Sequence, residues 1–179
     1  MTPNPVRRTR RGALAVLCLV LGACATAPEP APVVVALTDA SPQQMVAAIR
    51  EAAGDGEGEL AVQPLRDRRI EDLRERAARE EAAGDYVAAT ATVDAALEIV
   101  PTDPALLQQR AELALLLGQF DDAERLSQRA YALGPQVGPA CRRHWATLEQ
   151  VRLLQGDADG AAGARAQIGG CRVGVLDRF

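Results

Sequence analysis

The segment AAGDYVAATATVDAALEIVP, residues 82–101, is repeated in outline by LLGQFDDAERLSQRAYALGP, residues 116–135. Both segments carry a glycine, an aromatic residue, two alanines and a closing proline in the same order. Each later position follows its counterpart by 34 residues, as 118 follows 84. The pairs are Gly84 and Gly118, Tyr86 and Phe120, Ala89 and Ala123, Ala96 and Ala130, and Pro101 and Pro135. A fixed period of this length indicates a chain built from repeated supersecondary units.

The residue types at these positions fit a pair of antiparallel helices. Glycine allows the tight turn between the two helices, and the aromatic residue fills the space beside that turn. Alanine lets helices approach closely, and proline ends the second helix before the next unit begins. The pattern resembles the tetratricopeptide repeat. This resemblance implies an all-α, right-handed solenoid of helical hairpins, with repeats over residues 70–103 and 104–137.

A third, degenerate copy is expected over residues 142–170. Gly156-Asp157 repeats the glycine and aspartate of the first copy, and Trp145 stands where the family often has tryptophan. Ala158 replaces the aromatic residue, and no proline closes this copy. Such departures are typical of a terminal repeat. We therefore expect a tetratricopeptide-like domain over residues 66–171.

The N-terminus has the features of a secretory signal peptide. Four arginines precede the apolar segment Gly12–Ala23, which is shorter than the roughly 20 residues needed to span a bilayer. The segment runs into Leu21-Gly22-Ala23-Cys24, which resembles the lipobox of bacterial lipoproteins. That resemblance implies removal of residues 1–23 and attachment of a diacylglycerol, carrying acyl chains such as palmitate, to Cys24. Ala25, in place of aspartate, favours the periplasmic face of the outer membrane. The alternative is an ordinary signal peptide with a chance cysteine.

Between the anchor and the repeats, the composition predicts a tether and one separate helix. Residues 24–40 are rich in proline and poor in charge, which predicts a flexible, extended tether. Ser41-Pro42-Gln43-Gln44 fits a capping box, so a helix and linker are expected over residues 41–65. The acidic stretch GDGEGE, residues 54–59, lacks the ligand spacing of a calcium loop and is expected to be a solvated linker. Residues 172–179 form a C-terminal tail.

The mature chain is expected to be acidic. Four of the 20 arginines precede Cys24 and all 24 acidic residues follow it, which leaves 16 basic residues against 24 acidic ones and a net charge of −8. Such a chain is a poor partner for phosphate, so nucleic-acid binding is not expected. The sequence contains no lysine, which excludes Schiff-base chemistry. No cofactor is expected.

The remaining cysteines are candidates for one disulfide. With Cys24 lipidated and Cys18 removed, Cys141 and Cys171 are left, and the periplasm is oxidising. These two residues lie at the start of the first helix and just past the second helix of the third hairpin. An antiparallel hairpin brings those ends together, so we expect a Cys141–Cys171 disulfide. The alternative is two buried thiols.

The sequence gives little support for an enzyme. His144, the only histidine, follows Cys141 by three residues, a spacing that also occurs in nucleophile pairs and metal sites. Such sites need several converging groups, and no further candidates lie nearby. We expect a structural role for His144, no catalytic residue and no metal ligand.

The family resemblance implies protein–protein binding. Lipid-anchored proteins of this kind resemble assembly factors for secretion or pilus machinery, for outer-membrane proteins or for cell-wall enzymes. The expected function is therefore a membrane-anchored scaffold that binds a protein or peptide partner in the envelope. The alternatives are a binder of small ligands or peptidoglycan, and a cryptic hydrolase.

In the family, the first helix of each hairpin lines a binding groove. The expected groove residues are Glu71, Arg74, Ala78, Glu81 and Ala82 of the first repeat, Ala105, Gln108, Glu112, Leu115 and Leu116 of the second, and Arg143, Ala146, Gln150, Leu153 and Leu154 of the third. Exposed leucines from the second and third repeats would form an apolar strip with a charged rim, as in a peptide-binding groove. The alternative is that these faces are ordinary solvated helix surfaces.

Overall fold

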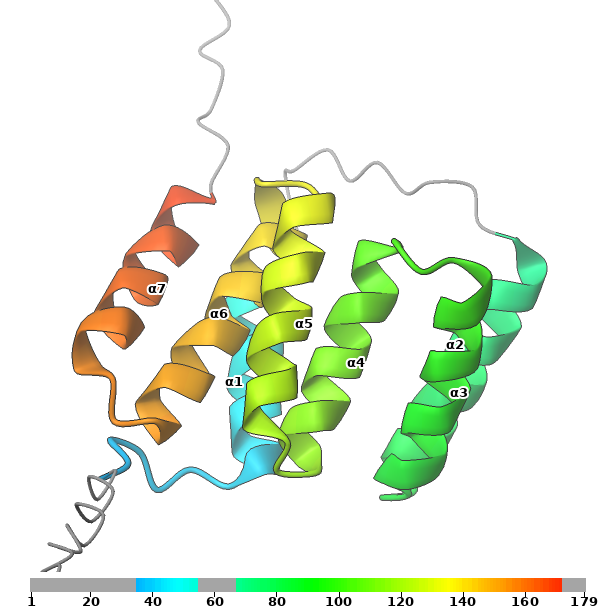
Figure 1. Ribbon diagram of the computed structural model, residues 1–179, viewed down its shortest axis with the longest axis horizontal. Helices are drawn as coiled ribbons and strands as arrows, with labels where there is room; N and C mark the ends of the chain where they lie inside the picture. Colours follow the sequence, from blue (N-terminus) through cyan, green and yellow to red (C-terminus); the bar gives the residue numbers. More distant parts are fainter. Residues whose placement is uncertain (1–34, 55–66, 172–179) are drawn as a thin grey trace, which may run out of the picture. The chain divides into compact units, whose positions relative to one another are not determined.

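The computed structural model describes residues 35–54 and 67–171, which belong to one compact unit. The expected signal peptide, Cys24, most of the tether, the GDGEGE linker beyond Gly54 and the C-terminal tail lie outside the described residues. Within the described ranges the chain forms seven helices and no strand (Figure 1). They are α1 (Pro42–Ala53), α2 (Arg68–Ala82), α3 (Tyr86–Ile99), α4 (Pro104–Leu116), α5 (Phe120–Leu133), α6 (Gly138–Leu154) and α7 (Ala158–Gly170). None of these helices is long and apolar enough to cross a bilayer.

Six of the helices form three consecutive hairpins. α2 packs on α3, α4 on α5 and α6 on α7, and each hairpin also packs on the next through α3 with α4 and α5 with α6. The turns inside the hairpins contain Gly84, Gly118 and Gly156, each with a φ between 72° and 79°. Only glycine adopts this left-handed conformation without strain. The expected all-α solenoid is therefore confirmed, with its turns at the glycines that define the repeat.

The repeated alanines lie at the closest helix contacts. Ala89, Ala96, Ala123 and Ala130 are all fully buried. Ala89 packs with Ala77 between α2 and α3, and Ala130 packs with Leu107 and Ala111 between α4 and α5. A larger side chain at such a position would push the two helices apart. The small residues thus set the spacing of each hairpin.

The third hairpin begins earlier than the sequence predicted. Its first helix, α6, starts at Gly138 rather than near residue 142, and it is 17 residues long where α4 has 13. The four extra residues that shift the register of the third repeat therefore form one additional helical turn, because an α-helix has 3.6 residues per turn. Pro139 occupies the first turn of α6, where proline needs no amide partner.

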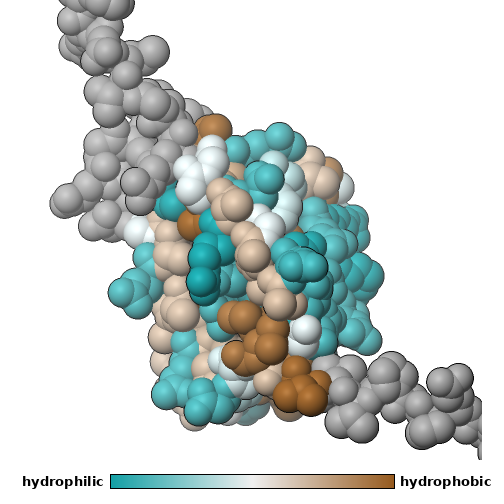
Figure 2. All heavy atoms as spheres, turned by 90° about the vertical axis from the view of Figure 1, so that its left-hand side faces the viewer, coloured by the Kyte–Doolittle hydropathy of each residue, from teal (hydrophilic) through white to brown (hydrophobic). Residues whose placement is uncertain are grey.

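The end of the solenoid presents small and polar side chains. On α7, Ala161 and Ala164 face α6 and are buried, whereas Ala162, Arg165 and Ala166 are exposed. Figure 2 views this end and shows a mixture of polar and weakly apolar residues, with a hydrophobic area in its lower part. This composition suits a terminal repeat, which has no further repeat to cover it.

The helix α1 lies outside the repeat and packs across it. The capping box expected at its start is present, since Ser41 accepts a hydrogen bond from the Gln44 amide and Gln44 accepts one from the Ser41 amide. Its apolar side chains Met45, Val46 and Ile49 are buried. They face α6 and α4, the first helices of the third and second hairpins (Figure 1). α1 therefore covers part of the face that the family uses for binding.

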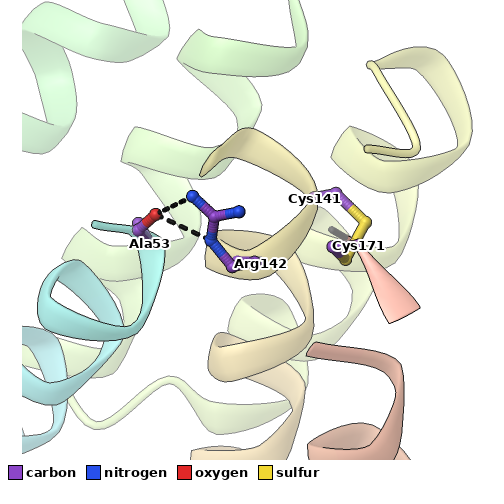
Figure 3. The surroundings of a disulfide bond; sticks show 4 residues. All are labelled: Ala53, Cys141, Arg142 and Cys171. Carbon is purple, nitrogen blue, oxygen red and sulfur yellow. Dashed lines mark hydrogen bonds between the residues drawn. A yellow bond between two sulfur atoms is a disulfide. The ribbon is translucent and has the colours of Figure 1, made fainter. Parts of the chain in front are cut away.

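A disulfide closes the third hairpin. The structure links Cys141 at the start of α6 to Cys171 just after α7, with the two Cα atoms 5.7 Å apart (Figure 3). The Gly138 amide donates a hydrogen bond of 2.7 Å to the Cys171 carbonyl oxygen, which adds a second link at the same place. α7 contains four glycines and has weak helix propensity. The bridge therefore reinforces the hairpin with the weakest second helix.

We predict that the double variant Cys141→Ala/Cys171→Ala loses stability. The bridge closes a loop with a sequence separation of 30, for which the chain-entropy model gives a stabilisation of about 3–4 kcal/mol. Urea unfolding of oxidised wild type and of the double variant measures this loss, and hydrogen exchange should show it first in α7. Dithiothreitol should weaken the wild type to the level of the variant and leave the variant unchanged. A variant as stable as oxidised wild type would contradict the prediction.

Candidate interaction site

The first helices of the three hairpins form one continuous surface, which we call the first-helix face and define by α2, α4 and α6. α1 divides this face into two parts. One part, on α4 and α6, lies beneath α1. The other part lies at the C-terminal end of α1, where no described residue of α1 covers it. The part beneath α1 is filled by apolar side chains and ion pairs. The part at the end of α1 is a cavity.

The open part is a cavity of about 990 Å³. Its walls come from the N-terminal halves of α2, α4 and α6, together with the end of α1. It is lined by Ala53, Gly54, Asp67, Ile70, Glu71, Arg74, Val100, Asp103, Pro104, Ala105, Gln108, Pro135, Pro139, Ala140, Arg143 and His144. Five of these, Glu71, Arg74, Ala105, Gln108 and Arg143, are among the expected groove residues. The mixture of apolar walls and a few polar groups is typical of a binding cleft.

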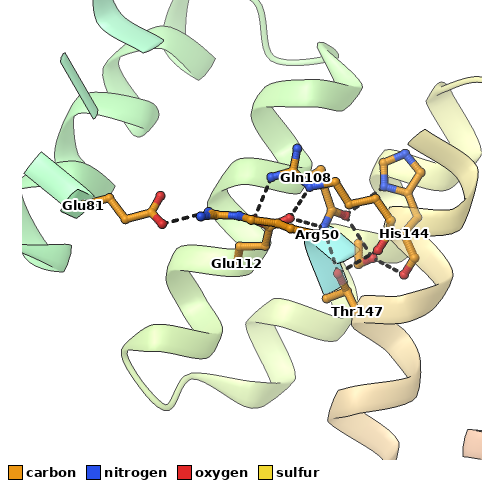
Figure 4. A network of polar contacts seen from close by, with 8 residues as sticks. Arg50, Glu81, Gln108, Glu112, His144 and Thr147 are labelled. Atoms are coloured by element: carbon orange, nitrogen blue, oxygen red, sulfur yellow. Dashed lines mark hydrogen bonds and ion pairs between the residues drawn. The ribbon is translucent and has the colours of Figure 1, made fainter. Parts of the chain in front are cut away.

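A fully buried carboxylate lies at the centre of the covered part. Glu112 on α4 has no exposed surface. Arg143 on α6 donates to both of its oxygens, with a distance of 2.7 Å from Nη2 to Oε2. Arg50 on α1 donates from Nε to Oε2 at 2.9 Å (Figure 4). Burial alone raises the pKa of Glu112, but Arg143 and Arg50 outweigh it and lower the pKa below its usual value. Glu112 is therefore an anion that joins three helices.

Arg50 extends this ion pair to the first hairpin. Its Nη2 lies 2.7 Å from Oε1 of Glu81 on α2. The guanidinium thus bridges Glu81 and Glu112, while its side chain stays 44% exposed. At the end of α1, Arg142 of α6 donates two hydrogen bonds to the Ala53 carbonyl oxygen, at 2.9 and 2.7 Å (Figure 3). α1 is therefore held by its apolar side chains in the middle and by arginine contacts toward its C-terminal end.

Glu112 also fixes the orientation of the Gln108 amide. A carboxylate only accepts hydrogen bonds, so the Gln108 amide nitrogen faces Glu112 at 2.9 Å and also donates to the Thr147 hydroxyl at 2.8 Å. The Gln108 carbonyl oxygen consequently faces His144, 2.8 Å from Nδ1 (Figure 4). This oxygen needs a donor, so the proton of the imidazole is on Nδ1.

His144 is a neutral, buried group at the wall of the cavity. Burial, together with the charge of Arg143, lowers its pKa to about 4, against a smaller opposing effect of the Glu112 carboxylate. The ring is therefore neutral at pH 7, with its lone pair on Nε2. Nε2 has no hydrogen-bond partner among the described residues. The role of His144 is to complete the polar network rather than to carry charge.

Neither a reactive Cys141–His144 pair nor a metal site forms in the described part of the chain. The sulfur of Cys141 is in the disulfide, so it offers no thiolate to His144. Within residues 35–54 and 67–171, no three His, Cys, Asp or Glu side chains come together as a metal site would need. What the arrangement can do is bind, through a preformed cleft and a surface with ordered charges.

Comparison with known proteins agrees with the observed fold. Residues 81–143 match the family model of the tetratricopeptide repeat. The helical domain has the fold of tetratricopeptide repeats. The chain is also similar to the globular C-terminal domain of P. aeruginosa LpoP, with a TM-score of 0.56 and 27% sequence identity over 59% of this chain and 99% of that one. No curated protein sequence matches the chain.

The tetratricopeptide-repeat domain does not expose the expected apolar strip. Leu115 is fully buried in a core with Val46 and Ile49 of α1, so the expectation that it is exposed is wrong. Leu116 is half-buried and packs against the same core. The physical reason is α1, which covers α4 and α6 and turns groove positions into core.

The other expected groove residues lie in several environments. Gln108, Glu112 and Ala146 are buried, and the first two belong to the polar network. Glu81 binds Arg50. Gln150, Leu153 and Leu154 are half-buried and lie outside the cavity lining, while Ala78 and Ala82 are exposed on α2. The structure therefore gathers part of the set around the cavity and the rest elsewhere on the first-helix face.

Sequence reasoning missed Arg50 and the position of His144 in the network. Arg50 lies on a helix that precedes the repeats, so the 34-residue period gives no information about it. The only signal in the sequence was its place one residue after Ile49, at the edge of the apolar stripe of α1. For His144, the sequence predicted a structural role, and the structure adds the partner that fixes its tautomer.

We predict that His144 makes the domain less stable as the pH falls. The folded pKa of about 4 lies below the value of about 6.5 for an unfolded histidine. The unfolded state therefore binds more protons between these values. The free energy of unfolding should be constant above pH 6.5 and fall by up to about 3 kcal/mol as the pH drops to 4.

Urea unfolding at pH 7, 6, 5 and 4.5 with the disulfide intact measures this loss. The variant His144→Asn keeps a donor for Gln108 but cannot titrate, so its stability should change much less over this range. Equal pH dependence in the variant and the wild type would show that His144 is not the responsible group.

Proposed function

We propose that this chain is a lipid-anchored protein of the periplasmic face of the outer membrane, which binds a protein or peptide partner through its tetratricopeptide-repeat domain. The observation that carries the proposal is the open cavity, which lies on the face formed by α2, α4 and α6 and is bordered by both apolar walls and ordered polar groups. Such a surface suits a short segment of a partner protein.

The proposed location rests on the sequence of the N-terminus. Leu21-Gly22-Ala23-Cys24 follows a basic and then an apolar segment, as in lipoprotein signals. The disulfide, which suits an oxidising compartment, supports an envelope protein. In this location the chain would act as a scaffold for an envelope complex, of the secretion, pilus, outer-membrane or cell-wall machinery.

The composition of the cavity favours a peptide over a glycan ligand. Among the described residues that line it, none is phenylalanine, tyrosine or tryptophan. Aromatic faces are the large, rigid contact surfaces that flat ligands use. Apolar groups such as Ile70, Val100 and Pro104, together with Arg74 and Arg143, instead suit the mixed side chains of a polypeptide.

We predict that Cys24→Ala abolishes membrane anchoring. Without the cysteine sulfur no diacylglycerol can be attached, and the chain should leave the outer-membrane fraction. Cys18→Ala is the matched control, because Cys18 lies in the same apolar segment and should leave both lipidation and location unchanged. Membrane fractionation and the mass of the mature chain measure the effect. A Cys24→Ala protein that still fractionates with the outer membrane would rule out the anchor.

We also predict that a partner contacts the cavity. A photo-crosslinking amino acid in place of Ala105, which is half-buried in the cavity wall, should give a defined adduct in intact cells. The same amino acid in place of Ala162, exposed on the outer face of α7, is the control and should give none. Mass spectrometry of the adduct identifies the captured chain. No adduct at Ala105, or equal adducts at both positions, would exclude the cavity as the contact site.

A further inference from the structure

The chemistry of α1 is that of a helix bound in a groove. It presents one apolar stripe, Met45, Val46, Ile49 and Ala53, to the first-helix face. One cation, Arg50, stands beside the stripe and pairs with Glu81 and Glu112. Apolar residues at helical spacing with a flanking charge are the means by which an amphipathic helix is recognised in a groove.

α1 also stands outside the repeated hairpins. It has no place in the 34-residue period, whereas every other helix belongs to a hairpin. Its first turn is satisfied by its own capping box, and at its other end the Gly54 amide bonds to the Glu51 carbonyl oxygen. The first turn therefore needs no partner from the domain, while at the other end Arg142 of α6 donates to the Ala53 carbonyl oxygen.

The surface beneath α1 keeps its ion pairs without α1. Glu112 retains both contacts from Arg143 and the hydrogen bond from Gln108 when Arg50 is removed. A buried carboxylate that lost all its partners would oppose the departure of α1, because an unpaired buried charge is strongly destabilising. Glu81 is half-buried and can be solvated. The covered face is thus able to exchange one arginine-bearing helix for another.

The cavity gives a different helix an advantage over α1. Ala53 and Gly54 line the cavity, so α1 ends at its border. Gly54 has a φ of 67°, which turns the chain away from the helix direction. A longer helix in this place would reach the border of the cavity of about 990 Å³, which no described residue of α1 beyond Ala53 and Gly54 lines. It would bury additional apolar surface there. α1 does not bury this surface, because it ends at the border of the cavity.

We propose that α1 is an intramolecular ligand, and that the face of α4 and α6 beneath it is a docking site for a basic amphipathic helix of a partner protein. That helix takes the place of α1, inserts an arginine or lysine between Glu81 and Glu112, and runs on into the cavity. This inference rests on the proposed function of the first-helix face as an interaction surface, and it adds the class of partner and its competition with α1.

The test uses the α1 sequence itself as the probe. The probe is a fluorescent peptide of residues 41–54, and the protein is the full mature chain carrying Ile49→Asp to weaken α1 in place. This variant should stay folded, with a cooperative melt by circular dichroism, and bind the peptide. The wild-type chain should bind it at least about tenfold more weakly, because its own α1 competes. A peptide with Arg50→Glu should bind the variant at least about tenfold more weakly, through loss of charge-assisted hydrogen bonds.

A second probe tests the role of the cavity. In this peptide Gly54→Ala is followed by one further helical turn of alanines, so that the helix continues. It should bind the variant more tightly than the first probe, by about tenfold or more, as expected for additional buried methyl groups. Equal affinity of the two peptides would overturn the claim that a partner helix displaces α1 by filling the cavity.

Four results would overturn the proposal. If the Ile49→Asp chain no longer folds, α1 is an essential part of the core and not a displaceable ligand. Hydrogen exchange on the unmodified chain tests the same point independently. In the unmodified chain, the amides of α1 should exchange at least about tenfold faster than those of α4. Equal exchange rates would contradict the claim that α1 can leave the face. A folded variant that does not bind the first peptide would remove the docking site. A wild-type dimer that exchanges α1 between copies would assign the site to a second copy.

These results are distinct from a failure of the proposed function. Crosslinking from Ala105 to a partner, combined with no exchange of the α1 peptide, would leave the function standing and remove only this inference. Peptide exchange without any crosslinked partner in cells would leave the docking site and remove the function.

Discussion

The ion pair between Glu112 and Arg143 is the interaction on which the arrangement of the first-helix face depends. A buried carboxylate is costly unless it is paired and hydrogen-bonded, and here Arg143, Arg50 and Gln108 meet that requirement from three helices. The second and third hairpins and α1 are thereby joined at one point. The same carboxylate orients Gln108, which in turn sets the proton of His144 on Nδ1. The charge of Glu112 thus determines the orientation of the Gln108 amide and the tautomer of His144.

The hairpins could be predicted from the sequence because their determinants repeat. Glycines at turns and alanines at close contacts recur every 34 residues, and a self-comparison finds them without any structure. The disulfide follows for a related reason, since Cys141 and Cys171 stand at two ends that any antiparallel hairpin brings together. These are local rules, and the third hairpin obeys them even with an extra turn at the start of α6.

The site was harder to predict because it depends on a helix outside the repeat. The sequence predicts that α1 exists, from its capping box and apolar residues, but periodicity does not say where it packs. Once α1 covers α4 and α6, Leu115 becomes core and Glu112 becomes buried. The tertiary contact of one twelve-residue helix therefore decides which groove positions remain available, and it leaves the cavity at its C-terminal end as the open one.

The most direct test of this account is the protonation state of the imidazole, observed by long-range nitrogen–proton NMR on the folded mature chain at pH 7. The chain contains one histidine, so the signals are unambiguous. If Glu112 orients Gln108 as described, His144 is neutral with its proton on Nδ1 and a lone pair on Nε2. A proton on Nε2 alone, or a charged ring at this pH, would contradict the claim that the buried carboxylate of Glu112 organises the first-helix face.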